Sequence, residues 1–145
     1  MVIIDASTAF KWFEPSEQDH NKALQLWDLH LQNKMKIVVP DLILYELANA
    51  WMTKSSIQLG QVKINLRVLE EASLEIIPVN FILINKATQF SKKYSVSVYD
   101  AIYAVLAKEK KCLLITADER FVEKMNKFFP LEINLPFIKL LKEYK

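Results

Sequence analysis

Four acidic residues occupy positions where a carboxylate is either costly or well placed for chemistry. Asp5 ends the apolar stretch VIID, and Asp118 follows a second apolar stretch in TADERF. Glu46 lies one turn into a predicted helix, and Asp100 opens another, DAIYAVLAKEK. Because an unpaired buried carboxylate costs several kcal/mol, an acid at the end of a buried strand requires a cation, a proton or a basic side chain.

These acids can meet if the strands are arranged in one parallel sheet. Ligands of open parallel sheets bind beyond the carboxyl ends of the strands, where the strand order reverses. If the strand of Asp5 is central and the strand before Asp118 is its neighbour, both acids lie at that point. Helices that begin at the same edge can add Glu46 and Asp100.

A cluster of this kind would favour a hard divalent cation. Four carboxylates about 5 Å apart repel each other by roughly 3 kcal/mol per pair at an effective dielectric constant near 20. Oxygen ligands without His or Cys suit Mg²⁺ or Mn²⁺. A pair of such ions can activate a water and stabilise the leaving oxygen of a phosphodiester. His20 and His30 match no zinc pattern, and we expect surface or core roles for them.

Purely structural explanations compete with this hypothesis. SVYD matches a capping box, with Ser97 as the N-cap and Asp100 as the reciprocal acid. TADE matches a second one, in which Thr116 caps and Glu119 reciprocates, so that Asp118 would only favour the helix dipole. The acid of the middle helix could be solvated. Convergence of all four on one edge is what favours a site.

The composition indicates an ordinary packed domain, and we expect a single domain over residues 1–145. Of the 145 residues, 52% are hydrophobic and 25% are charged, which excludes disorder. The net charge of +2 is too small to indicate a nucleic-acid binder by itself. The only glycine, Gly60, excludes a dinucleotide fingerprint and a Walker A loop, since both require several glycines.

The chain also carries signals about its compartment. Cys112 is the only cysteine and cannot form an internal disulfide, which favours a reducing compartment. No run of eighteen apolar residues and no signal-peptide pattern is visible. We therefore expect a cytoplasmic protein that does not enter the membrane.

Short apolar runs alternate with amphipathic segments, which predicts an α/β domain whose parallel sheet has helices on both faces. The predicted strands are 2–5, 36–39, 74–79, 112–117 and 131–135. The predicted helices are 18–33, 41–56, 60–72, 81–93, 98–110, 119–127 and 136–144. Asp41 is the expected N-cap of the second helix.

Four motifs in a fixed order carry a resemblance to a known family. VIIDAST, LILYELANAW, VYDAIYAVLA and LITADERF together resemble the PIN-domain family, and most of all the VapC-type ribonuclease toxins of prokaryotic toxin–antitoxin pairs. The resemblance covers nearly the whole chain. It implies a three-layer α/β/α fold with a central, mostly parallel sheet of about five strands. It also implies Mg²⁺- or Mn²⁺-dependent cleavage of RNA, a homodimer and a cognate antitoxin protein.

The family's functional residues match positions of this sequence. The resemblance implies that the same four acids are both the catalytic residues and the metal ligands: Asp5, Glu46, Asp100 and Asp118. Three further residues match supporting positions: Ser7, Asn49 and Thr116. Glu119 lies where some members carry a further acid, but we expect it to cap a helix.

Residues outside the motifs suggest contacts with substrate and partners. Lys11 and Arg120 lie near the motifs and are candidates for binding RNA phosphates. The aromatic residues Phe10, Trp12 and Phe13 could stack on a base, although aromatic residues at this spacing more often fill a core. The segment 41–72 carries more apolar surface than two flanking helices need, which indicates a dimer contact, an antitoxin groove or a thick core.

Two other classes of function remain open. The first is a non-catalytic PIN-like module that binds RNA or a partner. Retention of four mutually repelling acids argues against it. The second is phosphotransfer with Asp5 as the nucleophile, which is disfavoured because Ser7 replaces the second acid of a D-x-D strand end. A receiver-type phosphoacceptor is disfavoured because its acidic pair should precede the phosphoacceptor strand.

Overall fold

Five parallel strands form one sheet in a computed structural model that describes residues 1–54, 56–128 and 137–144. The strand order is β3-β2-β1-β4-β5, so β1 is central and the order reverses between β1 and β4. The strands are β1 Val2–Ile4, β2 Ile37–Pro40, β3 Glu75–Ile77, β4 Leu113–Thr116 and β5 Ile138–Leu140. The expected neighbourhood of the first and fourth strands is confirmed by the pairing of Ile3 with Leu114.

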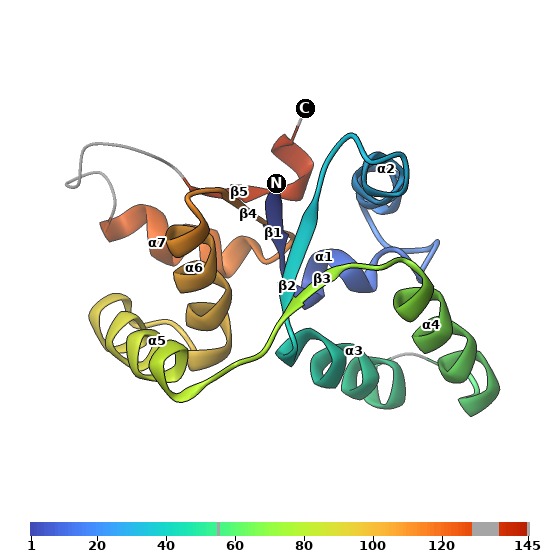
Figure 1. Cartoon of the computed structure of the whole chain (residues 1–145), viewed down its shortest axis with the longest axis horizontal. Coiled ribbons are helices and arrows are strands. Elements are labelled where there is room, and N and C mark those ends of the chain that lie inside the picture. The colour runs from blue at the N-terminus through green and yellow to red at the C-terminus, as the bar shows by residue number, and fades with distance from the viewer. Residues whose placement is uncertain (55, 129–136, 145) are drawn as a thin grey trace.

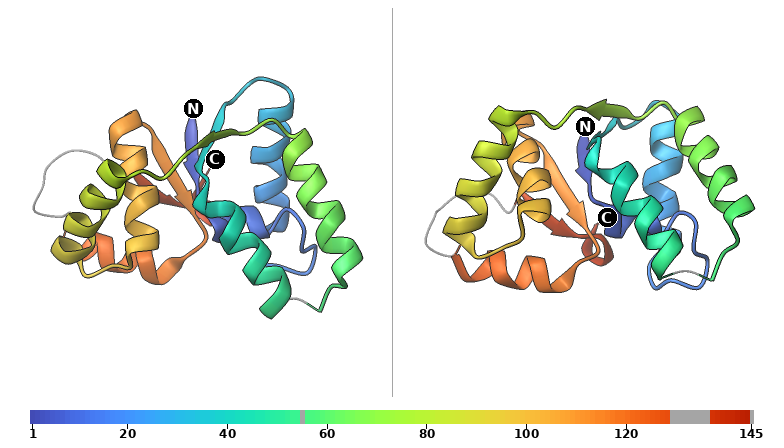
Figure 2. Two further views of the ribbon diagram at one scale, coloured as in Figure 1. Left: turned by 60° about the horizontal axis from the view of Figure 1, so that its bottom comes forward. Right: turned by 90° about the horizontal axis from the view of Figure 1, so that it is seen from below.

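Helices cover both faces of this sheet, and the predicted three-layer α/β/α fold is confirmed. Figure 1 shows α5 and α6 on one side, α1 and α2 on the other, and α3 and α4 extending away beyond β2. The same arrangement is seen from two further directions in Figure 2. The helices are α1 Ala6–Phe10, α2 His20–Leu31, α3 Leu42–Thr53, α4 Leu59–Glu71, α5 Phe81–Tyr94, α6 Val98–Lys110 and α7 Glu119–Phe128, followed by the short 3-10 helix η2 Leu141–Glu143.

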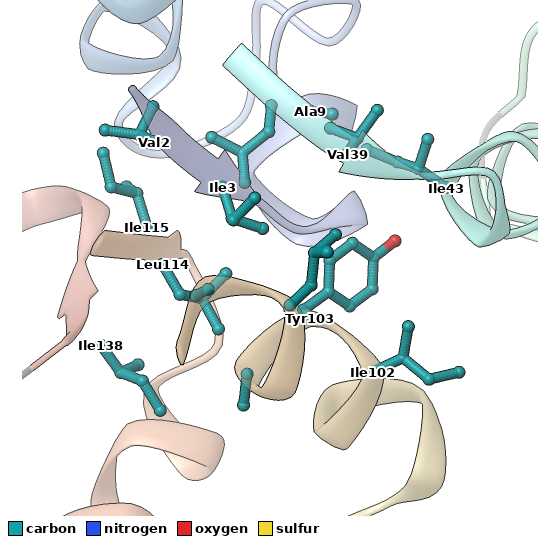
Figure 3. Close-up of a cluster of buried hydrophobic side chains, with 14 of the residues drawn as sticks. Val2, Ile3, Ala9, Val39, Ile43, Ile102, Tyr103, Leu114, Ile115 and Ile138 are labelled. Carbon is teal, nitrogen blue, oxygen red and sulfur yellow. The ribbon is translucent and has the colours of Figure 1, made fainter. Parts of the chain in front are cut away.

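The core lies between the central strands and α6. Ile3 and Ile4 of β1 are fully buried because helices cover both faces of that strand. In α6 every residue from Ala101 to Ala107 is buried, so this helix has no solvated face over two turns. Figure 3 shows side chains of β1, β2, β4, β5 and α6 meeting in one cluster. This packing fixes α6, and with it Asp100, against the central strands.

An aromatic cluster connects α3 to the first helices. The ring of Trp12 contacts Trp27 edge-on at 4.4 Å between centroids, and Phe13 contacts the fully buried Trp51 of α3 at 5.2 Å. Trp12 also donates its ring N–H to the carbonyl oxygen of Ala23 at 2.9 Å. The core interpretation of Trp12 and Phe13 is therefore correct, and the cluster positions the helix that carries Glu46.

One prediction about the elements was wrong, and one element was missed. The segment 136–144 was predicted as a helix, but β5 and η2 occupy residues 138–143. In the structure Ile138 and Leu140 are buried and the residue between them is only partly buried, as expected for a strand. The predicted strand 131–135 lies outside the described residues. Helix α1 was not predicted, because five residues are too few to show a helical period.

Asp41 has a different role from the one expected. It occupies the N-cap position of α3, but its side chain makes no capping bond to that helix. Its carboxylate instead accepts a hydrogen bond from the backbone N–H of Val79 at 3.0 Å. This bond joins the start of α3 to the segment after β3. None of the helices in the described ranges is long and apolar enough to cross a membrane.

Candidate functional site

The four acids predicted from the sequence line one pocket of about 470 Å³ at the carboxyl edge of the sheet. Asp5 follows β1, Glu46 lies in α3, Asp100 lies in the first turn of α6, and Asp118 follows β4. The pocket is further lined by Ala6, Ser7, Phe10, Lys11, Glu17, Asn49, Ala50, Lys54, Tyr103 and Ala117. The topology thus brings together residues that are more than a hundred positions apart.

Asp5 is the most buried of the four, with 8% of its surface exposed. It is the N-cap of α1 and accepts a hydrogen bond from the backbone N–H of Thr8 at 3.0 Å. The hydroxyl of Ser7 donates to Oδ1 at 2.7 Å, and the hydroxyl of Thr116 donates to Oδ2. Burial raises the pKa of Asp5, although these hydrogen bonds lower it in part.

The same two hydroxyls also position the segment that carries the fourth acid. Ser7 Oγ accepts the backbone N–H of Ala117 at 2.9 Å, and Thr116 Oγ1 accepts that of Asp118 at 3.0 Å. Each hydroxyl therefore donates to Asp5 and accepts from the turn after β4. This network holds the ends of β1 and β4 in one rigid unit.

Glu46 projects into the pocket from α3 and is half-buried. Its Oε2 accepts a hydrogen bond from the hydroxyl of Tyr103 at 2.5 Å. Burial raises the pKa of Glu46, and the charges of Asp5 and Asp100 raise it further. Sequence reasoning missed Tyr103. Its position three residues after Asp100, on the same side of α6, was the available signal.

Asp100 belongs both to the pocket and to a helix cap. Its backbone N–H donates to Ser97 Oγ at 3.0 Å, and the Ser97 hydroxyl donates to its carboxylate at 2.7 Å. The predicted capping interaction therefore exists alongside the pocket position. Burial raises the pKa of Asp100, and the charge of Asp118 adds to this effect.

The predicted capping scheme after β4 was wrong. Asp118 itself caps α7, because its Oδ1 accepts the backbone N–H of Phe121 at 3.0 Å. Thr116 is occupied with Asp5 and the N–H of Asp118, as described above. Glu119 is exposed and forms an ion pair with Lys142 at 2.6 Å, so it does not cap the helix.

Little positive charge lies near enough to compensate the negative charge of the pocket acids. Among the described residues, no Lys or Arg lies within ion-pair distance of any of the four. Lys54 and Lys124 act on Glu46 and Asp100 only through longer-range attraction. Over the same described residues, no three Asp, Glu, His or Cys side chains are close enough together to hold a metal ion.

The predicted substrate-binding residues differ in position. Lys11 lines the pocket, but its ammonium forms an ion pair with Glu17 at 3.0 Å. Arg120 is exposed in α7 and is not among the residues that line the pocket. Lys54, at the end of α3, lines it instead and was missed, because its approach depends on the direction of that helix. Asn49 is an exposed lining residue.

The sequence matches the family model of the PIN domain over residues 2–126. The chain belongs to the PIN-domain family. This match covers all four acids of the pocket and every element from β1 to most of α7. No curated protein matches the sequence closely enough to be counted as a relative.

Solved structures share the fold of this PIN domain at low sequence identity. The crystal structure of PAE2754 from Pyrobaculum aerophilum has a TM-score of 0.69 at 14% identity, covering 97% of this chain and 90% of that one. A toxin–antitoxin complex from Klebsiella pneumoniae has a TM-score of 0.65 at 15% identity, covering 99% and 100%. Mycobacterium tuberculosis VapC20 (Rv2549c), a Sarcin-Ricin loop cleaving toxin, has a TM-score of 0.68 at 14% identity, covering 85% and 94%.

Proposed function

We propose that this PIN-domain protein is a metal-dependent endoribonuclease and the toxin of a type II toxin–antitoxin pair. The observation that supports the activity best is the set of four carboxylates around one pocket, none of which has an ion-paired Lys or Arg among the described residues. Burial raises the pKa of three of them. A bound cation would relieve the repulsion and desolvation that the fold maintains here.

The donor set suits Mg²⁺ or Mn²⁺ in kind. The four acids that line the pocket offer only oxygen ligands. Both ions prefer carboxylate oxygens and water as ligands. The residues that would hold the ion are Asp5, Glu46, Asp100 and Asp118. The ion would supply an activated water and charge stabilisation for phosphodiester hydrolysis. Because the side chains lie too far apart to form a finished cage, we expect them to draw together on binding.

Other residues that line the pocket would bind the RNA substrate. RNA carries its charge on phosphates, which an acidic pocket repels, so cations at the rim must offset that repulsion. Lys54 lines the pocket and has no ion-pair partner within the described ranges, whereas Lys11 must leave Glu17 to reach a phosphate. We assign the first phosphate contact to Lys54 and a second to Lys11. Asn49 can offer an amide to a base or a sugar hydroxyl.

A second surface suits the proposed antitoxin. A groove of about 560 Å³ lies between α3, α4 and β3, away from the acids. Its apolar floor includes Ile43, Leu66 and Leu74, and Lys63 and Arg67 lie among its lining residues. An amphipathic helix can bury its apolar face in such a groove. A chain of a solved toxin–antitoxin complex shares this fold. We propose that the protein meets both of these partners in the cytoplasm.

Part of the apolar surface predicted for the helical pair is exposed. Trp51, Val62 and Leu69 are buried, whereas Met52 and Leu59 are each 60% exposed. We propose that the exposed part contributes to a homodimer, since exposed apolar patches often mark protein contacts. A monomer by size exclusion at micromolar concentration would contradict the dimer.

One observation favours a second candidate function, a PIN-like module that binds RNA without cleaving it. In the described residues no three potential ligands are close enough to hold an ion. A binding module would need only the rim of the pocket. It would not need four pocket acids that have no ion-paired Lys or Arg among the described residues. For that reason we favour the nuclease.

Cleavage of total RNA by the pure protein separates these functions. We expect degradation in Mg²⁺ that stops on addition of EDTA and is lost in the variant Glu46→Gln. Glu71→Gln, at an exposed position at the end of α4, is the matched control and should cleave like the parent. RNA binding without cleavage in Mg²⁺ and in Mn²⁺ would support the binding module instead.

The toxin role has its own test. Expression of the parent should arrest growth of the host cell, and expression of Glu46→Gln should not. Co-expression of the protein encoded beside this one should restore growth and should copurify with it. Growth arrest that persists with Glu46→Gln would show that toxicity does not depend on the pocket.

A further inference from the structure

A buried hydroxyl lies beneath the acidic pocket. Tyr103 of α6 is only 2% exposed. Figure 3 shows its ring among the apolar side chains of the core, with the hydroxyl at the edge of that cluster. A buried hydroxyl requires a hydrogen-bond partner, and the hydrogen of this one goes to Glu46 Oε2 at 2.5 Å.

Tyr103 also lies near the end of the central strand, β1. Tyr103 lines the same pocket as Asp5 and Ala6, and α6 packs directly against β1. Ala6 directly follows Asp5 and opens α1. Tyr103 therefore joins α6 to α3 through its hydrogen bond to Glu46 and lies in the same pocket as the end of β1. All three elements contribute acids to that pocket.

We propose that Tyr103 is a positioning residue that fixes the carboxylate of Glu46 for metal binding. This inference rests on the proposed function. A glutamate has three rotatable side-chain bonds, and holding it in one conformation costs entropy at the moment of binding. A hydrogen-bond donor that is fixed in the core restricts the glutamate before the ion binds, so less entropy is lost on binding. The bond uses only Oε2, so Oε1 stays available to an ion.

The chemical type of the donor supports this role. An ammonium or guanidinium at the same place would cancel the charge of Glu46 and compete with a cation. A phenol orients the carboxylate and does not neutralise its negative charge. Two of the other three acids follow the same pattern: Ser7 and Thr116 donate to Asp5, and Ser97 donates to Asp100. With Tyr103, neutral hydroxyls orient three of the four acids.

The test is the variant Tyr103→Phe, which removes one oxygen and keeps the ring that fills the core. Outer partners of metal ligands typically contribute about 10–100-fold to metal affinity or activity. We expect the dissociation constant for Mn²⁺, measured by electron paramagnetic resonance of the free ion, to rise by about that factor. The Mg²⁺ concentration for half-maximal RNA cleavage should rise in parallel, and saturating Mg²⁺ should restore much of the rate.

Tyr94→Phe is the matched control. Tyr94 is also a buried tyrosine, but it lies in α5 away from the pocket. It should bind Mn²⁺ like the parent. A purely structural role of Tyr103 would lower the thermal stability of Tyr103→Phe without changing Mn²⁺ affinity, and that result would overturn the proposal.

A double-mutant cycle with Glu46→Gln tests whether Tyr103 acts through Glu46. If it does, adding Tyr103→Phe to Glu46→Gln should weaken Mn²⁺ binding no further. Full additivity would overturn the proposal. Since the readout is metal binding, a parent that binds Mn²⁺ but cleaves no RNA contradicts the proposed function alone. Unchanged Mn²⁺ affinity in Tyr103→Phe, with an active parent, contradicts this inference alone.

Discussion

The two edges of the parallel sheet treat their acidic residues in opposite ways. At the carboxyl edge, Asp5, Glu46 and Asp100 are held by hydroxyl groups, and burial raises the pKa of each. At the amino edge, Glu75 begins β3 between two lysines. The same chemical group is thus left without a cation at one edge and surrounded by cations at the other.

The amino edge shows how this fold satisfies an acid for structural purposes. Lys36, just before β2, and Lys110, at the end of α6, both form ion pairs with Glu75, the latter at 3.3 Å. The hydrogen bond from Lys36, with the one from Lys110, holds the pKa of Glu75 below its usual range. The chain therefore has lysines available to neutralise acids, and it places none within ion-pair distance of the pocket acids in the described residues.

This difference indicates what the carboxyl edge is for. A charge that is oriented but not neutralised destabilises the empty protein and favours an external cation. A charge paired with lysines contributes a little to the fold and leaves nothing for a ligand to bind. The comparison predicts that changes at the two edges will separate activity from stability.

The largest effect should come from Asp5→Asn. A metal site stabilises the transition state by several kcal/mol, so loss of a central ligand should reduce RNA cleavage by about 10³-fold. The free energy of unfolding should stay the same or increase, because a buried charge with a raised pKa is removed. A cleavage assay at saturating Mg²⁺ and a thermal melt of the same preparation measure both quantities.

Glu75→Gln is the matched change at the other edge and should leave the cleavage rate at the parental value. If Asp5→Asn cleaves RNA as fast as the parent, Asp5 is not a metal ligand and the contrast between the edges has no functional meaning. An inactive Glu75→Gln with normal stability would be equally damaging.

The sequence predicted the carboxyl edge well because its signals are local and chemical. An acid at the end of an apolar run, as with Asp5 and Asp118, requires no knowledge of packing to be noticed. Glu46 and Asp100 were singled out by their places near the starts of predicted helices, and the family resemblance then implied their roles as metal ligands. The position of the pocket followed from strand order, since β1 lies beside β4.

What the sequence could not show depends on side-chain direction across elements. Tyr103 resembles any core aromatic residue until α3 is placed beside α6, and Lys54 resembles any surface lysine until α3 ends at the pocket. Arg120 shows the reverse error, because closeness in sequence to Asp118 did not place it at the pocket. The strand β5 was missed because its three residues are too few to show a period of two.

The second largest effect should be stabilisation by the cation itself. A ligand that binds only the folded state adds about 2.7 kcal/mol at a concentration 100 times its dissociation constant. For a domain of this size that corresponds to a rise in Tm of roughly 9 °C. We expect such a rise for the parent in Mg²⁺ at neutral pH, reversed by EDTA, and almost none for Asp5→Asn. Equal shifts in both proteins would mean that Mg²⁺ binds elsewhere.

The dependence of stability on pH should be smaller and should have a defined sign. The raised pKa values of Asp5, Glu46 and Asp100 mean that the folded protein binds protons which the unfolded chain releases above its ordinary carboxyl pKa, about 4. The free energy of unfolding therefore falls as pH rises from there through the raised values. In EDTA, Tm should be a few degrees higher at about pH 5.5 than at about pH 7.5.

Removing one pocket acid should flatten this dependence. Asp5→Asn should show a smaller difference in Tm between the two pH values than the parent does. Addition of Mg²⁺ should flatten it as well, since the ion takes the place of the protons. A Tm that rises with pH over this range in EDTA would contradict the contrast between the edges.

The smallest effect should come from the ion pairs of Glu75. Its lowered pKa favours the folded state above the ordinary carboxyl pKa, and this contribution is lost only as pH falls through the lowered value. Because the two lysines and Glu75 are partly exposed, water and salt screen their attraction. Glu75→Gln should lower Tm by about 1–2 °C at low ionic strength and by less in about 1 M salt. A larger loss in Tm that does not depend on salt would mean that more than the charge of the two lysines holds Glu75. The amino edge would then resemble the carboxyl edge more than its two ion pairs indicate.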